Sequence, residues 1–295
     1  MYWGTSTTLN ATGFRRREIV QSEFTSDFIT DRTGFSIQQE FELWENWIFN
    51  YGYRYERTRT FDREADPNCP LPLDDPFCRF DETFDIAPLS SSISWDTRDD
   101  FLDATRGHFT SHAVEFAPAT LGSDLRFLKY FGQFFQYIPL SAPTDGPFGK
   151  GIKKPRWVYA AGLRVGLGRG FAGQGLIFSE RYLAGGGTTI RGFEQNTVGP
   201  KDFFGDPVGG EALFITNQEL RFPLVSIFDG VGFLDIGNTY EKVSNFSLWD
   251  VRKAAGVGVR VRNPYFLLRL DYGFKLDRKP GEALGKFFFS IGQAF

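Results

Sequence analysis

Two histidines, four residues apart, have a type and spacing that could support catalysis. His108 and His112 would share one face of a β-strand, because successive side chains point to opposite sides. A general acid–base or nucleophilic site also needs a serine, an aspartate or a similar partner within hydrogen-bond reach. No such constellation can be assigned from the spacing, so we predict neither a catalytic site nor a cofactor.

The two cysteines, Cys69 and Cys78, lie close together in a stretch rich in proline and aspartate. In an oxidising compartment, two cysteines that close a short loop are expected to form a disulfide bridge. A metal site is the weaker interpretation, because no second pair of cysteines or histidines accompanies them. We therefore predict a disulfide between these residues and no metal site.

The composition combines many aromatic residues with ordinary polarity. Aromatic residues make up 17% of the 295 residues, with 34 phenylalanines, while charged residues make up 23%. No stretch approaches the roughly 20 apolar residues that a membrane-spanning helix needs. A β-barrel in lipid has an apolar, aromatic-rich outer surface and a polar lumen, which fits both values. Basic residues are balanced by acidic ones, for a net charge of −3, and form no long run, so no nucleic-acid partner is expected.

Alternation of apolar and polar residues with a period of two predicts β-strands. In 47–56 aromatic residues alternate with polar and charged ones, and similar patterns recur at 157–168, 255–262 and 265–276. The polar positions place arginine beside glycine, which suits a wet, crowded lumen better than the outer face of a soluble sandwich. We therefore predict an all-β fold, a transmembrane antiparallel up-and-down β-barrel that occupies 1–295.

About twelve such strands follow one another, and the turns between them alternate between short and long. The long connections, 62–81 and 171–210, are expected on the outer side of the membrane, and the short ones on the periplasmic side. Residues 140–156, rich in proline, glycine and lysine, fall on the short side and break this rule. The strands are predicted near 2–10, 34–43, 47–58, 86–96, 108–119, 125–139, 157–168, 211–222, 230–240, 251–262, 265–276 and 286–295.

The sequence begins without a secretory signal. Met1 leads directly into an aromatic stretch, with no charged segment, apolar segment or cleavage site. A barrel needs such a signal to reach the outer membrane, so we expect the chain to be a mature fragment or part of a longer product.

The connection 171–210 has an unusual length and composition. About forty residues without a regular element are uncommon, and such connections are usually functional or disordered. This one contains apolar residues such as Leu176 and Tyr182 among its glycines, which is not a disordered composition. In a barrel the only nearby shelter is the lumen, so we predict a loop that folds into it.

If the loop folds inward, Arg191 meets carboxylates on the lumen side of the following strands. Glu219 and Asp235 lie on the next two predicted strands. The alternative, which the residues alone leave open, is an arginine in solvent.

Several motifs, in order along the chain, resemble the BamA/TamA superfamily. The segment 180–200 resembles the family's signature loop and contains the Arg-Gly-Phe sequence, here Arg191, Gly192 and Phe193. The Phe-Leu-Asp-Ile-Gly at 233–237 is similar to the Phe-x-Asp-x-Gly of a later strand. The other matching pieces are 96–107, 218–223, the strand with Gly256, Gly258 and Arg260, and the final strand ending in Phe295.

The resemblance implies a barrel of sixteen strands that opens laterally between its first and last strands and follows periplasmic POTRA domains. The twelve strands recognised here begin about four strands late, so the first strand of the gate is expected to be missing or replaced. The family's motif pairs its arginine with two acidic positions. The lock predicted to fix the loop in the lumen therefore consists of Arg191, Gly192, Phe193, Glu219 and Asp235.

The last strand carries apolar residues on one face, which resembles the C-terminal signal recognised by barrel-assembly machinery. A glycine interrupts this strand without a side chain to pack, and this weakens strand pairing. The family has a glycine there that is tied to pliability at the seam. The predicted seam residues are Phe287, Phe289, Ile291, Gly292 and Phe295.

The resemblance implies an assembly factor of the bacterial outer membrane that inserts other barrels without a chemical step. A weak seam and local bilayer thinning would lower the barrier for incoming strands, whose unpaired edges are costly in lipid. The expected partners are outer-membrane lipids, unfolded outer-membrane proteins and, through the missing periplasmic region, accessory lipoproteins.

Two other functions are considered. One is a polypeptide-secretion pore of the same superfamily, as in two-partner secretion. The other is a barrel protease or lipase that uses His108 and His112, which we otherwise interpret as polar residues of the wet lumen or rim.

Overall fold

The computed structural model describes residues 6–20, 28–62, 81–146, 149–155, 157–202, 205, 207–225, 227–262 and 267–292. Within them, one antiparallel sheet of 13 strands contains almost all of the regular structure. Its strands are β1 (Thr7–Val20), β2 (Phe28–Trp44), β3 (Trp47–Asp62), β4 (Asp81–Ile86), β5 (Leu89–Asp96), β6 (Gly107–Ala117), β7 (Phe127–Pro139), β10 (Val158–Gly170), β11 (Ala212–Pro223), β12 (Phe228–Tyr240), β13 (Arg252–Arg262), β14 (Leu267–Lys275) and β15 (Gly285–Ile291).

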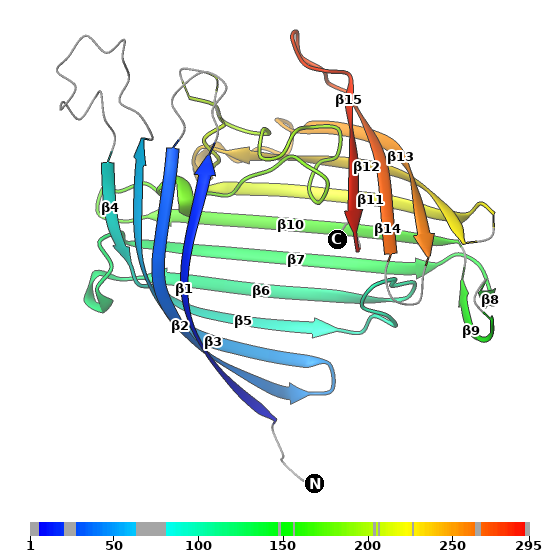
Figure 1. Cartoon of the computed structure of the whole chain (residues 1–295), viewed down its shortest axis with the longest axis horizontal. Helices are drawn as coiled ribbons and strands as arrows, with labels where there is room; N and C mark the ends of the chain where they lie inside the picture. Colours follow the sequence, from blue (N-terminus) through cyan, green and yellow to red (C-terminus); the bar gives the residue numbers. More distant parts are fainter. Residues whose placement is uncertain are drawn as a thin grey trace.

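The sheet follows the order of the chain. Each strand of the path β1-β2-β3-β5-β6-β7-β10-β11-β12-β13-β14-β15 pairs with its neighbours in that path, and β4 pairs with β3. Figure 1 shows the sheet curling, with β5 to β11 as a back wall and β1 to β3 and β13 to β15 standing in front of it on either side. Within the described residues, β1 and β15 are the two ends of this path. The predicted all-β, antiparallel up-and-down topology is confirmed.

No helix in the described part of the chain is long and apolar enough to cross a membrane.

The two faces of the sheet have opposite chemistry. On β14 the side chains of Arg269 and Asp271 are 1% and 0% exposed, whereas Leu270 and Phe274 are 49% and 39% exposed. Charged residues therefore face inward and apolar residues face outward. This is the reverse of a soluble protein and is the arrangement expected of a barrel surrounded by lipid.

Three of the predicted elements need correction. The first strand was placed at 2–10, but β1 is Thr7–Val20, because the arginines at 15–17 belong to the strand and Arg17 contacts Asp31 of β2 at 2.6 Å. The strand at 86–96 is interrupted between β4 and β5 at Pro88, which has no N–H to donate to the ladder.

The third correction concerns 140–156, for which no strand is predicted from the sequence. It contains β8 (Pro143–Gly146) and β9 (Gly149–Pro155), which form a two-stranded sheet of their own. The insertion is therefore a hairpin and adds no strand to the barrel wall.

Cys69, Cys78 and Phe295 lie outside the described residues. The disulfide and the end of the last strand stay predictions.

Candidate functional site

The connection between β10 and β11 packs against the inner face of the sheet. It includes the 3₁₀ turn η2 (Phe178–Glu180), and isolated bridges join Tyr182 to Gly210 and Ala184 to Val198. Four of its buried apolar residues form one cluster with residues of β11 and β13, while Leu176 packs in another cluster with β4 and β7. The first cluster contains Ala184, Ile190, Phe193, Val198, Leu213, Ile215 and Ala254.

Arg191, at the turn of this loop, is 1% exposed and points into the barrel wall. Its Nε and Nη2 donate to the two carboxylate oxygens of Asp235, each at 2.7 Å. Its backbone N–H also donates to Asp235, at 3.0 Å, and Nη1 donates to Glu219. The planar guanidinium thus binds both carboxylates that flank it, an arrangement that lysine could not reproduce.

The face of the same guanidinium lies over an aromatic ring. Its Cζ is 3.6 Å from the centre of the Phe233 ring, within cation–π range. Asn217 donates both to Asp235 and to the backbone carbonyl of Thr189, each at 2.7 Å. The loop is therefore held by side-chain and backbone contacts from β11 and β12.

Arg191 belongs to a wider buried network of charges. Asp271 on β14 lies 3.6 Å from its Nη1, and Glu219 also accepts from Arg221 at 3.1 Å and from Arg260 at 3.4 Å. Seven side chains that are each at most 4% exposed take part: Arg191, Arg221, Arg260, Arg269, Glu219, Asp235 and Asp271. Glu219 and Asp271 each lie against three of these arginines, whereas Asp235 pairs with Arg191 and accepts from the neutral Asn217.

Burial alone would lower the pKa of Arg191, because it disfavours the charged form. Glu219 and Asp235 outweigh this effect and raise the pKa above its ordinary value. The arginine is therefore charged at any physiological pH.

Two glycines allow the loop backbone to touch the wall. Gly192 has a φ of +94°, a left-handed conformation that glycine adopts without strain. A Cβ on Gly273 of β14 would lie 2.5 Å from the backbone nitrogen of Gly192 and 2.7 Å from the carbonyl carbon of Arg191. Neither backbone could accommodate it without moving.

Phe193 completes the predicted lock residues and lies on the other side of the turn. It is 2% exposed, with the guanidinium of Arg252 and the ammonium of Lys275 at 4.5 and 5.1 Å from its ring centre. The structure thus brings all five predicted lock residues together on β11, β12 and the loop.

The comparisons with known proteins agree with this geometry. A family model described as the Omp85 superfamily domain matches residues 2–295. The chain belongs to the Omp85 superfamily.

Among its relatives is the outer membrane protein assembly factor BamA of Nitratidesulfovibrio vulgaris, which is 28% identical over an alignment 291 residues long that covers 94% of this chain and 33% of that protein. BamA of Neisseria meningitidis serogroup B is 25% identical over an alignment 239 residues long that covers 69% of this chain and 28% of that protein. This Omp85 chain thus spans about a third of the length of the curated relatives that it matches.

The fold is shared with a solved structure, BamA from Haemophilus ducreyi lacking POTRA domains 1–3. The TM-score is 0.80 at 18% identity, with 97% of this chain and 59% of that chain covered. Together these findings confirm the predicted resemblance, the barrel fold and the location in the bacterial outer membrane.

The predicted seam residues that the structure describes lie on β15 and directly after it, and the apolar ones face outward. Phe287, Phe289 and Ile291 are 67%, 70% and 70% exposed, and Gly292 has a φ of +99° while its N–H donates to Leu267 at 2.8 Å. These residues differ from the lock in chemistry, because they form an exposed apolar surface, whereas the lock consists of buried charged groups.

The inward face of β15 contacts the loop. Lys286 donates to Glu194 at 2.8 Å. Arg269 donates to the carbonyl of Gly187 and to the hydroxyl of Ser290, both at 2.8 Å. The loop is therefore connected to the last strand as well as to β11 and β12, which the sequence did not predict.

A second ionic contact holds the base of the Omp85 loop. Glu180 is 3% exposed, and its carboxylate accepts from Lys129 of β7 at 2.8 Å and from Arg54 of β3 at 3.3 Å. The residue lies inside the signature segment, but no role was assigned to it from the sequence.

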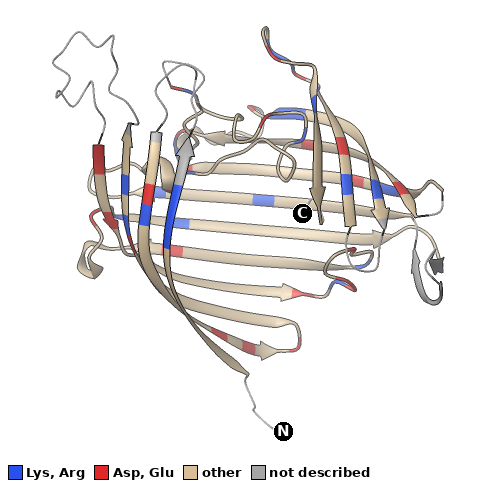
Figure 2. Ribbon diagram, viewed as in Figure 1, with Lys and Arg blue, Asp and Glu red and all other residues tan. Residues whose placement is uncertain are grey.

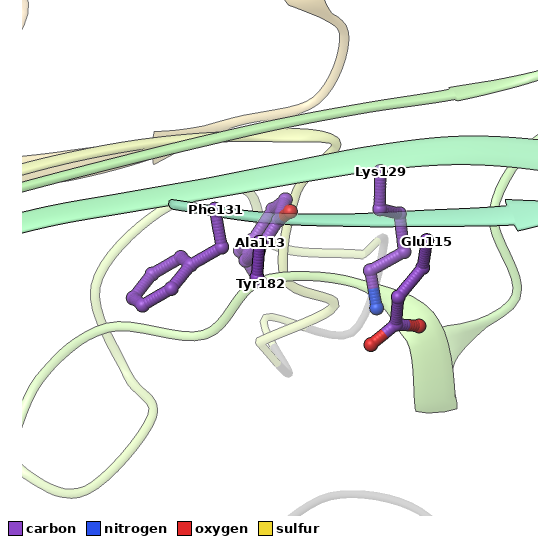
Figure 3. A pocket seen from close by; sticks show the side chains of 5 residues that line it. All are labelled: Ala113, Glu115, Lys129, Phe131 and Tyr182. Carbon is purple, nitrogen blue, oxygen red and sulfur yellow. The ribbon is translucent and has the colours of Figure 1, made fainter. Parts of the chain in front are cut away.

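The second contact borders a pocket of about 260 Å³. Figure 3 shows Lys129 and Glu115 extending toward the same space, with Tyr182 and Phe131 beside them. The rings of Phe131 and Tyr182 stack at 6.2 Å, and the Tyr182 hydroxyl donates to the carbonyl of Tyr130 at 2.9 Å. Glu180 and Tyr182 thus fasten the start of the loop to β3 and β7, whereas the lock contacts β11 and β12.

Glu180→Gln should lower the free energy of unfolding by about 1–2 kcal/mol at pH 7, because a buried charged hydrogen bond is lost. Burial raises the pKa of Glu180, but Lys129 and Arg54 outweigh it and hold the pKa below the usual range. The contribution is therefore complete above about pH 4.3, the usual pKa of glutamate, and is lost as the pH falls through the lower folded value.

Urea unfolding of the wild type and the variant, at pH 7 and pH 3, measures this effect. The difference between them should shrink at pH 3, whereas Glu241→Gln, at an exposed position after β12, should differ little from wild type at either pH. A difference that is absent at pH 7, or equal at both pH values, would contradict the role of Glu180.

The two histidines lie on the outer face of the sheet rather than in the lumen, and His108 is the second residue of β6, next to the turn that precedes it. They alternate with the inward residues of β6 and share their face with Val114 and Phe116, which are 41% and 43% exposed. His108 packs edge-on against Trp95 at 4.2 Å, and the His112 ring hydrogen-bonds to the Tyr130 hydroxyl at 2.7 Å. Within the described residues, no group of His, Cys, Asp and Glu has the arrangement of a metal site.

Proposed function

We propose that this chain is the membrane-barrel part of an outer-membrane protein assembly factor, and that it acts on unfolded barrel proteins without a chemical step. The observation that carries the proposal is its similarity to BamA over 94% of its length, together with the buried contact of Arg191 with Glu219 and Asp235. The relatives named as assembly factors favour this function over a secretion pore.

In this proposal the lock sets the shape of the lumen loop, and the loop in turn supports the last strand. Arg191 anchors the loop to β11 and β12, while Glu194 of the same turn contacts Lys286 of β15. A barrel edge that pairs with incoming strands and then releases them must keep its extended conformation while it has no partner strand. The loop is suited to that support because it contacts β15 from the inside.

The last strand provides the weak edge. Within the described residues, which end at Gly292, β15 has seven residues, compared with 17 in β2, and pairs with Leu268–Phe274 of β14. Over that range few backbone hydrogen bonds hold β15, so it separates at a lower cost than a longer strand does. Unfolded outer-membrane proteins, the lipid bilayer and accessory lipoproteins bound outside this region are the proposed partners.

The proposal is tested with the full chain folded into phospholipid vesicles. An unfolded outer-membrane barrel protein is added, and its folding is followed by the gel shift between heated and unheated samples. Vesicles with the wild-type chain should fold the substrate several-fold faster than empty vesicles. Arg191→Ala should remove most of this gain, while Arg126→Gln, an exposed change before β7, should keep it. Equal rates with and without the folded chain would refute the function.

A further inference from the structure

The outward face of β1 to β3 is apolar along most of its length. On β3, Trp47, Phe49, Tyr51, Tyr53 and Tyr55 point outward, since they alternate with the buried inward residues. Aromatic pairs link them across strands, such as Phe41 with Tyr51 at 5.7 Å and Phe35 with Tyr55 at 5.9 Å. This surface has the composition of a wall that faces hydrocarbon.

The same outward face becomes charged immediately beyond Tyr55. The register places Arg15, Thr33, Arg57 and Asp85 in one row across β1, β2, β3 and β4. The next row consists of Arg17, Asp31, Arg59 and Thr83, and Asp81 follows on β4. Figure 2 shows these blue and red bands over the upper parts of β1 to β4.

The charged side chains of the two rows pair with one another and remain exposed. Arg17 binds Asp31 through two contacts of 2.6 Å, and Arg57 binds Asp85 through two contacts of 2.8 Å. Arg59 binds Asp81 at 2.8 and 2.6 Å. The arginine side chains of these pairs are 50% to 62% exposed. Such exposed pairs are weak, so other anions can compete for the guanidinium groups.

The position of the rows matches one boundary of the bilayer. From Trp47 to Tyr55 the strand advances eight residues, about 27 Å along its axis at ~3.4 Å per residue. A strand tilted by about 40° then covers roughly 20 Å of depth, close to the ~25 Å apolar band of outer-membrane barrels. Charged side chains on the lipid face are costly at the midplane and nearly neutral at the interface. The rows therefore lie at the level of the lipid headgroups.

We propose that the outward rows Arg15, Arg17, Arg57 and Arg59, with their aspartates, form a binding surface for anionic phosphate-bearing lipid headgroups. Four arginines stand against Asp31, Asp81 and Asp85, so the surface carries a net positive charge. Guanidinium groups bind phosphate oxygens through two parallel hydrogen bonds, which suits headgroups at the edge of the hydrocarbon. When no headgroup is bound, the aspartates pair with the arginines and keep them oriented.

Lipid is favoured over a protein partner because the rows continue an apolar face that lipid already covers. The surface is separate from the lumen lock, so its binding does not depend on assembly activity. Headgroup binding would fix the level of β1 to β4 in the bilayer and would enrich anionic lipids beside these strands.

The experiment uses the folded full chain in phosphatidylcholine vesicles that contain traces of spin-labelled lipid. Electron paramagnetic resonance gives the fraction of the label held at the protein, for phosphatidylglycerol and for phosphatidylcholine. The wild type should prefer phosphatidylglycerol. Arg15→Gln with Arg57→Gln should reduce this preference by about twofold to fivefold, as expected for basic residues near a membrane surface. High salt should weaken the preference of the wild type.

Removing the acids should have the opposite effect. Asp31→Asn with Asp85→Asn should increase the preference for phosphatidylglycerol, and it keeps the test decisive if the arginine variant does not fold. Arg126→Gln changes one positive charge outside the rows and should behave like the wild type. No preference in the wild type, no response to either double substitution, or an equal loss in Arg126→Gln would overturn the proposal.

Discussion

Arg191→Ala should lower the free energy of unfolding by about 3–5 kcal/mol, the range for breaking a buried ion pair on one side. Asp235 would lose the two hydrogen bonds donated by the guanidinium, and Glu219 would lose one, while the backbone N–H at position 191 stays available to Asp235. Urea unfolding of the folded barrel, followed by the gel shift between heated and unheated samples, measures the change.

In a hydrated lumen, screening by water would reduce this effect to about 1–2 kcal/mol. The structure argues for the larger value, since Arg191, Glu219 and Asp235 are 1%, 1% and 0% exposed. Water does not reach these groups, so the acids left behind would be buried without their partner. Arg221 and Arg260 still contact Glu219, which limits the loss and should leave a folded barrel with a mobile loop.

Two further variants separate charge from geometry. Arg191→Lys keeps the charge but loses the two parallel hydrogen bonds of the guanidinium, so its unfolding free energy should lie between those of Arg191→Ala and the wild type. Arg191→Glu should be more damaging than alanine, and Asp235→Arg should partly rescue it if the two residues touch. An unfolding free energy of Arg191→Ala within about 0.5 kcal/mol of the wild type, the usual range of surface substitutions, would rule out the lock.

The strands of the wall were predictable because their signal is local. Alternation along β3, β10, β13 and β14 follows directly from the geometry of one strand and needs no knowledge of its neighbours. The alternation separates the residues of the two faces, but it does not say which face is turned toward the lumen and which toward the lipid. His108 and His112 were predicted to be polar residues of the lumen or rim, and their shared parity with Val114 and Phe116 was the signal that they face outward rather than into the lumen.

The contacts of the lumen loop were only partly predictable. Arg191 was expected to meet Glu219 and Asp235, and the structure has these contacts, while their functional role stays a proposal. The network is completed by Arg221, Arg260, Arg269 and Asp271, whose contacts with the lock were not predicted. Which of them meet depends on the register between strands, such as Gly258 opposite Asp271, and sequence alternation does not contain it.

The second anchor illustrates a different limit. Glu180 binds residues that are 51 and 126 positions away in the chain, on β7 and β3. These strands come near the base of the loop only because the sheet curls, as Figure 1 shows. A buried glutamate at the start of a loop full of apolar residues was the available signal, since such a charge needs a partner.

Gly273→Ala should push the loop away from the wall and lower the free energy of unfolding by about 1–3 kcal/mol, the usual cost of overpacking. The added Cβ would fall 2.5 Å from the nitrogen of Gly192 and 2.9 Å from the carbonyl oxygen of Arg191. Both are backbone atoms, so no rotamer change can relieve the clash. The lock turn has to move, and with it the guanidinium that binds Asp235.

Limited trypsin digestion of the folded barrel measures this displacement, because trypsin cleaves after arginine and Arg191 is 1% exposed in the wild type. Cleavage at Arg191 should be slow in the wild type and much faster in Gly273→Ala. The control is Gly232→Ala on β12, which β13 separates from β14 in the sheet, and where an added Cβ meets no atom within 4 Å. If Gly273→Ala is cleaved no faster than Gly232→Ala, the loop tolerates displacement from β14, and close contact at Gly192 is not what keeps Arg191 in the wall.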